Sequence, residues 1–108
     1  MADYNKVILV GKLGETPALQ HGARGPYTTL RIANNKQYTN QDTGEIVRRA
    51  IWHDVILFGS FAETVVRIYR AGQEVMIDGE LNYLENEDMP YPRAQIVAKF
   101  VQLTGGRD

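Results

Sequence analysis

The order of its secondary-structure signals constrains this chain most: five strand-like runs, with one helical segment between the third and the fourth. β-branched and aromatic residues are frequent in these runs, and several alternate with polar residues as half-buried strands do. The runs lie at about 6–10, 28–33, 46–58, 75–83 and 93–103. This order predicts an all-β OB-fold, a five-stranded Greek-key barrel with one α-helix between strands 3 and 4.

Local signals support two of the connections. Residues 40–44 contain Asp42 and Gly44, which predicts a hairpin turn before the third strand. Ser60 followed by Glu63 is a capping-box pattern, so we expect Ser60 to cap a helix of about three turns. Gly72 fits the left-handed position after the end of that helix. Apolar residues recur in the segment at helical spacing: Phe61, Ala62, Val65, Ile68 and Tyr69.

Length and composition indicate one ordinary globular domain. A chain of 108 residues has room for a single modest core, and it contains no internal repeat or low-complexity tract. Hydrophobic residues make up 44% and charged residues 23%, which argues against a disordered chain. We expect one domain over residues 1–108, with an ordered core from about 4 to 104.

Several classes of protein are excluded or disfavoured. The chain has no cysteine, which excludes disulfides, thiolate metal sites and a cysteine nucleophile. No stretch approaches the roughly 20 apolar residues of a membrane span. The N-terminus lacks the basic and apolar regions of a signal peptide. The sequence therefore predicts a cytoplasmic protein with no membrane association.

Catalytic constellations are also missing. His53 and Asp54 are neighbours on a strand, so their side chains point to opposite faces of the sheet. They therefore cannot form the catalytic pair in which an aspartate orients a histidine that acts as a general base. His21 is the only other histidine, and no metal-ligand spacing links the two. No glycine-rich phosphate loop is present. We expect no enzyme activity, no metal and no cofactor.

The third strand presents a candidate surface for stacking nucleic-acid bases. Trp52 and Phe58 are separated by an even number of positions, so both side chains point to the same face of the strand. Aromatic side chains on an outer face can stack unpaired bases, and Tyr38 and Tyr83 would extend this platform. Alternation alone does not decide which of the two faces is buried, so Trp52 could also lie in the core. Residues of the other parity are more continuously apolar, and we assign them to the core: Ile51, His53, Val55 and Leu57.

Basic residues are distributed unevenly over the predicted elements. The net charge is −1, which argues against binding driven by bulk charge. Any contacts with phosphate must therefore come from a local arrangement of cations on the strands. The candidates are Lys6, Lys12, Arg31, Lys36, Arg48, Arg49 and Lys99.

Four segments in register resemble bacterial single-stranded DNA-binding proteins (SSB). They are Asn5–Gly14 with the following Pro17, the hairpin at 43–45, Trp52–Gly59 and Gly72–Leu81. The resemblance implies a homotetramer that wraps single-stranded DNA without sequence preference, in DNA replication, recombination and repair. It implies base stacking on Trp52, Phe58 and Tyr38, and a subunit contact at His53.

The chain departs from that family at three places. Asp54 stands where many members carry a basic residue. Its carboxylate adds repulsion toward the phosphates of DNA beside the stacking surface. The segment 85–92 is short and acidic; a family tryptophan falls near Asn86, so Tyr83 is only a shifted substitute. The sequence ends at 105–108 without the acidic tip that recruits partners, so we do not expect partners that depend on a tail.

Two other functions remain open at this stage. A protein similar to primosomal replication protein N would share the fold and form a dimer. An OB-fold module for protein interaction would bury Trp52 and Phe58 in a partner, since aromatic residues also anchor protein interfaces. Phosphate binding should depend steeply on salt, whereas an apolar interface should respond weakly.

Overall fold

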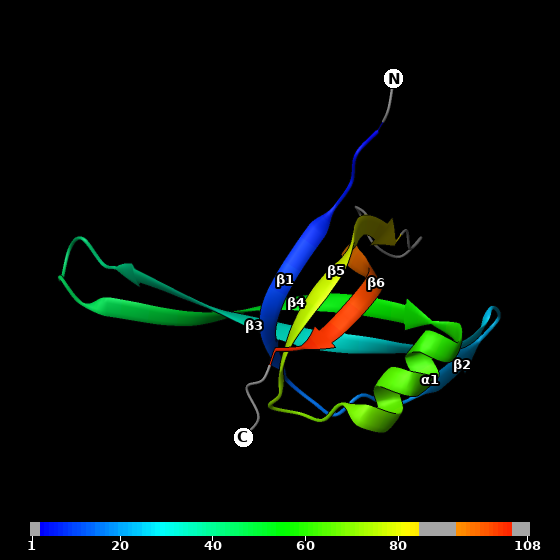
Figure 1. The fold of residues 1–108 in the computed structure, drawn as a ribbon. Coiled ribbons are helices and arrows are strands. Elements are labelled where there is room, and N and C mark those ends of the chain that lie inside the picture. Colours follow the sequence, from blue (N-terminus) through cyan, green and yellow to red (C-terminus); the bar gives the residue numbers. More distant parts are fainter. Residues whose placement is uncertain (1–2, 85–92, 105–108) are drawn as a thin grey trace.

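The computed structural model describes residues 3–84 and 93–104, and most of these lie in strands (Figure 1). The helix α1 (Gly59–Ile68) separates four strands from the last two. The strands are β1 (Val7–Leu13), β2 (Gln20–Gly22), β3 (Gly25–Thr39), β4 (Ile46–Phe58), β5 (Glu74–Leu84) and β6 (Arg93–Leu103). The short β2 was not predicted. It pairs with the start of β3 through a turn at Ala23 and Arg24, and Gly25 after this turn has a φ of +102°, which favours glycine.

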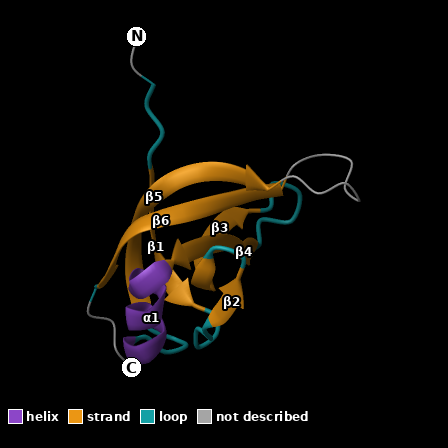
Figure 2. Ribbon diagram, turned by 90° about the vertical axis from the view of Figure 1, so that its right-hand side faces the viewer, coloured by secondary structure: helices purple, strands orange, loops and turns teal. Residues whose placement is uncertain are grey.

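The strands close into the predicted barrel, so the OB-fold is confirmed. The sheet order is β1-β5-β6-β4-β3-β2, and β1 also pairs with β3 at Lys12↔Ala33 and Leu13↔Ile32. Gly11 makes this closure possible, because a Cβ at that position would collide with the carbonyl oxygen of Ala33. Figure 2 shows α1 against one end of the barrel, where it contacts β3 and β4.

The barrel interior is apolar and draws on every long element. Val55 and Leu57 are buried as predicted, but Ile51 is 41% exposed and is not a core residue. The reason is that β3 and β4 run past the barrel as a two-stranded arm, here defined as residues 34–51 (Figure 1). The core consists of Leu13, Leu30, Ile32, Val55, Leu57, Ala62, Val65, Tyr69, Val75, Ile77, Ile96 and Ala98.

The ends of α1 differ from the sequence prediction. The helix already begins at Gly59, with Phe58 as its N-cap and no side-chain cap, so the expected capping by Ser60 is wrong. Because β4 runs directly into α1, Ser60 lies in the first turn, where its carbonyl accepts a hydrogen bond from Thr64 Oγ1 at 3.1 Å. Gly72 has the expected positive φ, but it lies in a separate turn and its N–H donates to Leu13 O.

The turn at the tip of the arm is confirmed. The backbone N–H of Asn40 donates to Glu45 O at 2.8 Å, and Gly44 has a φ of +77°. The side-chain oxygen of Asn40 accepts hydrogen bonds from the N–H groups of Asp42 and Thr43, which fixes the turn locally. Within the described ranges, no helix is long and apolar enough to cross a membrane.

Candidate nucleic-acid interface

Trp52 and Phe58 lie on the outer face of β4, away from the core as predicted. In the β3–β4 register they face Ala33 and Tyr27, so all four side chains share one side of the sheet. Trp52 is 47% exposed and Phe58 is 40% exposed. Two large aromatic side chains are therefore available to a ligand on the same surface.

The indole of Trp52 is held from two directions. A Cβ at Gly14 would collide with the six-membered ring, so the glycine lets the indole lie close to the chain after β1. The guanidinium carbon of Arg31 lies 4.9 Å from the ring centroid, in a cation–π contact. These contacts orient the ring while about half of its surface stays accessible.

Phe58 borders an open groove on the same face. The groove has a volume of about 740 Å³ and crosses the outer side of β3, β4, β6 and β5. Tyr27, Ile56 and Val97 contribute apolar surface, and Arg24 in the β2–β3 turn contributes a positive charge. A flat apolar group and a nearby anion both fit this lining.

Asp54 lies between the two aromatic residues and engages two arginines. Its Oδ2 accepts a hydrogen bond from Arg93 Nη2 at 2.8 Å, and its Oδ1 lies 3.6 Å from Arg31 Nε. Arg93 was not among the residues predicted to contact phosphate. Arg93 and Asp54 are 39 positions apart in the sequence, and only the parallel pairing of β4 with β6 brings their strands together.

The arm carries three of the predicted cations. Lys36 lies directly opposite Arg49, and Arg48 lies opposite Gln37, to which its Nε donates at 3.1 Å. Lys36 and Arg49 share one face of the arm, and Arg48 lies on the other face with the Trp52 side of the sheet. Like charges in direct opposition are unfavourable unless an anion lies between them.

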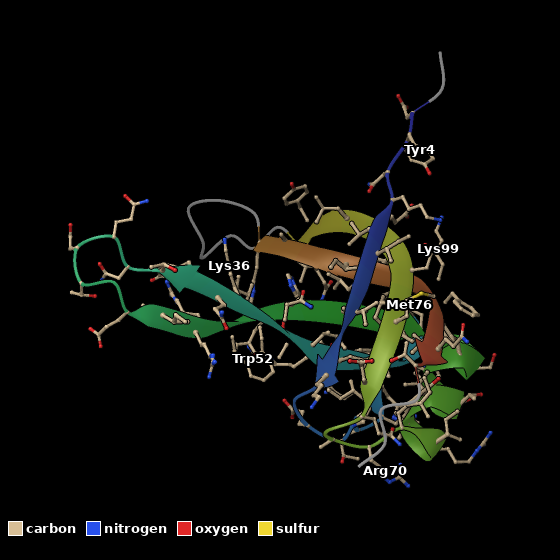
Figure 3. All side chains as sticks on the ribbon, turned by 60° about the vertical axis from the view of Figure 1, so that its left-hand side comes forward. Tyr4, Lys36, Trp52, Arg70, Met76 and Lys99 are labelled. Atoms are coloured by element: carbon tan, nitrogen blue, oxygen red, sulfur yellow. The ribbon has the colours of Figure 1, made fainter. Side chains whose placement is uncertain are left out.

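Lys6 and Lys99 lie apart from the aromatic surface. Lys6 Nζ is 3.0 Å from Asp78 Oδ2, and this hydrogen bond raises the pKa of Lys6. Lys99 Nζ is 3.3 Å from Glu80 Oε2. Figure 3 shows Lys36 and Trp52 along the β3–β4 hairpin, whereas Lys99 lies beside β5. Lys12 is exposed at the end of β1.

The two tyrosines are not on the Trp52 surface. Tyr38 faces Val47 in the register, which places it on the same arm face as Lys36 and Arg49. Tyr83 faces Ala94 on the side of β5 that continues the core face, beyond the barrel. Both are exposed, but the structure does not join the four aromatic residues into one platform.

An apolar surface lies on the outer side of β1, β5 and β6. Ile8, Val10 and Phe100 are exposed there, and the strand register places Met76 on the same face, with Asp78 between Ile8 and Phe100. His53 is half-buried near this region. Its Nε2 is 2.8 Å from Asn34 Oδ1, and Asn34 Nδ2 donates to Val10 O at 2.6 Å.

Among residues 3–84 and 93–104, no group of three or more His, Asp or Glu side chains is placed to hold a metal ion. The segment 85–92, in which the lost tryptophan contact at Asn86 was predicted, lies outside the described residues, as do residues 105–108.

Comparison with known proteins is consistent with this geometry. The sequence matches the Single-strand binding protein family over residues 4–104. It is 31% identical over 109 residues to Single-stranded DNA-binding protein 1 of Xylella fastidiosa, covering 97% of this chain and 80% of that protein.

Solved structures share the fold. A Plasmodium falciparum SSB in complex with ssDNA matches with a TM-score of 0.76 at 20% identity, covering 95% of each chain. The wild-type single-stranded DNA-binding protein of Thermus aquaticus matches with a TM-score of 0.79 at 26% identity, covering 96% of this chain and 52% of that one.

Proposed function

The chain belongs to the single-strand binding protein family, and we propose that it binds single-stranded DNA by stacking bases on Trp52 and Phe58 while cations hold the phosphates. The protein is a binding protein and not an enzyme. Its binding serves DNA replication, recombination and repair, and a cytoplasmic location belongs to the same proposal.

One observation carries this proposal: two accessible aromatic side chains share the outer face of β4 and have arginines between them. Trp52 and Phe58 are six positions apart, which is roughly 20 Å along an extended strand. Each base that stacks on an aromatic ring contributes about 1–3 kcal/mol. Stacking uses the ring faces that all bases share, so this mode of binding does not read sequence.

Lys36 and Arg49 extend the proposed path of the DNA to the face of the arm opposite Trp52. A phosphate near Lys36 and Arg49 would relieve the repulsion between these opposed charges. Tyr38 lies on the same face of the arm and provides a second stacking position there. Arg31, Arg48 and Lys12 are the further phosphate contacts that we propose. Lys6 and Lys99 are left out because each is paired with a carboxylate and neither lines the pockets beside Phe58 and Asp54.

Titration with oligo-dT tests the proposal, because Trp52 is the only tryptophan of the chain. We expect strong quenching of its fluorescence and an affinity that falls steeply with salt. Lys36→Ala combined with Arg49→Ala should reduce the slope of log K against log salt by about 0.7, since the one phosphate that these cations share contributes about 0.7 for a single strand.

Lys6→Ala is the matched control and should leave the slope unchanged. Absence of binding at low salt, verified by a direct assay with labelled DNA, would contradict the proposal. Binding that hardly responds to salt would instead favour an OB-fold module that docks on an apolar surface.

The second part of the proposal concerns assembly. Family members form oligomers, and we propose a homotetramer, rather than a dimer, built on the apolar face of β1, β5 and β6. Exposed Ile8, Val10 and Phe100 form an apolar surface of the kind that subunits bury. Hydrogen bonds link His53 through Asn34 to Val10 O, which supports a role for this histidine at the same interface.

Val10→Glu should break this assembly, because the interface would then bury an unpaired charge. The wild-type protein should have about four times the chain mass of 12.2 kDa in sedimentation or light scattering, and the variant should be smaller. Ile68→Glu, on the exposed side of α1, should keep the wild-type mass. A Val10→Glu protein that also keeps this mass would show that subunits do not meet at this face.

A further inference from the structure

We infer that Arg31, Asp54 and Arg93 form a binding site for one phosphate of the DNA backbone, in which Asp54 is the positioning residue. The inference rests on the proposed binding of single-stranded DNA and names a subsite of it. The three side chains come from β3, β4 and β6 and meet on the outer face of the sheet. We refer to them as the arginine clamp.

The burial of the three groups places the positive charges outermost. The side chain of Asp54 is 22% exposed, whereas those of Arg31 and Arg93 are 48% and 62% exposed. An anion that approaches from solvent therefore meets the two guanidinium groups before it meets the carboxylate. Each guanidinium has five N–H donors, and Asp54 occupies only part of that capacity.

The position of the clamp along β4 fits a phosphate between stacked bases. Outward-facing residues alternate along the strand, so Asp54 is the first outward residue after Trp52 on the way to Phe58. Arg31 contacts both the indole of Trp52 and the carboxylate of Asp54. A nucleotide with its base on Trp52 would thus hold its phosphate beside Arg31.

A pocket next to the clamp provides room for this group. It has a volume of about 370 Å³ and lies between the chain after β1 and the start of β6. Thr16, Gln20 and Gln95 line it together with the clamp, so polar partners are present for a phosphate. Glu15 also lines it, is exposed, and forms no ion pair with the described side chains.

Glu15 supplies a matched control for the role of Asp54. Replacing either acid by its amide removes one negative charge from the same pocket, and simple repulsion predicts tighter DNA binding in both variants. If Asp54 aims the arginines, Asp54→Asn should instead bind oligo-dT about three- to tenfold more weakly, as for the loss of one ordinary hydrogen bond. Glu15→Gln should bind at least as tightly as the wild-type protein.

The arginines are tested by the salt dependence of binding. Arg31→Gln and Arg93→Gln should each reduce the slope of log K against log salt by about 0.7, the contribution of one phosphate contact. Thermal melting of each variant verifies that the barrel is folded, and the two arginine variants test the site even if Asp54→Asn is unstable.

Two results would overturn the inference. One is an Asp54→Asn protein that binds as tightly as Glu15→Gln, and the other is an unchanged salt slope in both arginine variants. In either case, quenching of Trp52 by oligo-dT would show that the proposed function survives without this subsite. A wild-type protein that does not bind oligo-dT would contradict both.

Discussion

Trp52→Ala is expected to weaken binding of oligo-dT by about 5- to 150-fold, which corresponds to the loss of about 1–3 kcal/mol for one base stack. The side chain is exposed on the outer face of β4, and it is already oriented by Gly14 and Arg31. Little conformational entropy of the side chain is therefore lost when a base stacks on this ring. Alanine removes the ring face without touching the core.

The anisotropy of a labelled oligo-dT strand measures this effect, since the variant has no tryptophan of its own. Trp52→Phe should retain part of the affinity, because phenylalanine keeps an aromatic face. Tyr83→Ala is the matched control: this tyrosine is at least as accessible as Trp52 but lies on the other side of its strand. Equal losses in Tyr83→Ala and Trp52→Ala would contradict a platform centred on β4.

Ile77→Ala is expected to lower the free energy of unfolding by about 2–5 kcal/mol, because it leaves a cavity in a closely packed interior. Ile77 is completely buried in β5, between Leu9 of β1 and Val101 of β6. Such a loss is a large part of the about 5–15 kcal/mol that stabilises a typical domain. Urea denaturation at one fixed protein concentration measures it.

Ile46→Ala is the control for this cavity, since it removes the same atoms from an exposed position in the arm. It should change the free energy of unfolding by no more than about 0.5 kcal/mol. Similar losses in both variants would show that the described barrel interior is not the main source of stability.

Local sequence patterns were sufficient for the fold class and for the orientation of β4. Alternation placed Val55 and Leu57 inside and Trp52 and Phe58 outside, because successive side chains of an extended strand point to opposite faces. The same rule misplaced Ile51. The alternation of side chains shows which face each residue occupies, but it does not show where the barrel ends and the arm begins.

The N-cap of α1 was predicted at the wrong residue for a related reason. A pattern such as Ser60 with Glu63 fits a helix preceded by a loop, whereas β4 here continues into α1 through Gly59. The start of the helix was thus set by the strand before it. The short β2 also escaped detection, because three residues are too few to produce a periodic signal.

The sequence by itself determined the order of the five long strands and the helix, the two aromatic residues on the outer face of β4 and the absence of a thiol site. Only the tertiary structure decided which charges act together. Arg93 reaches Asp54 because β6 pairs with β4, and Tyr38 and Tyr83 are separated from Trp52 by the register of their strands. Periodicity is a local property of the chain, whereas the pairing of distant strands depends on the closure of the whole barrel.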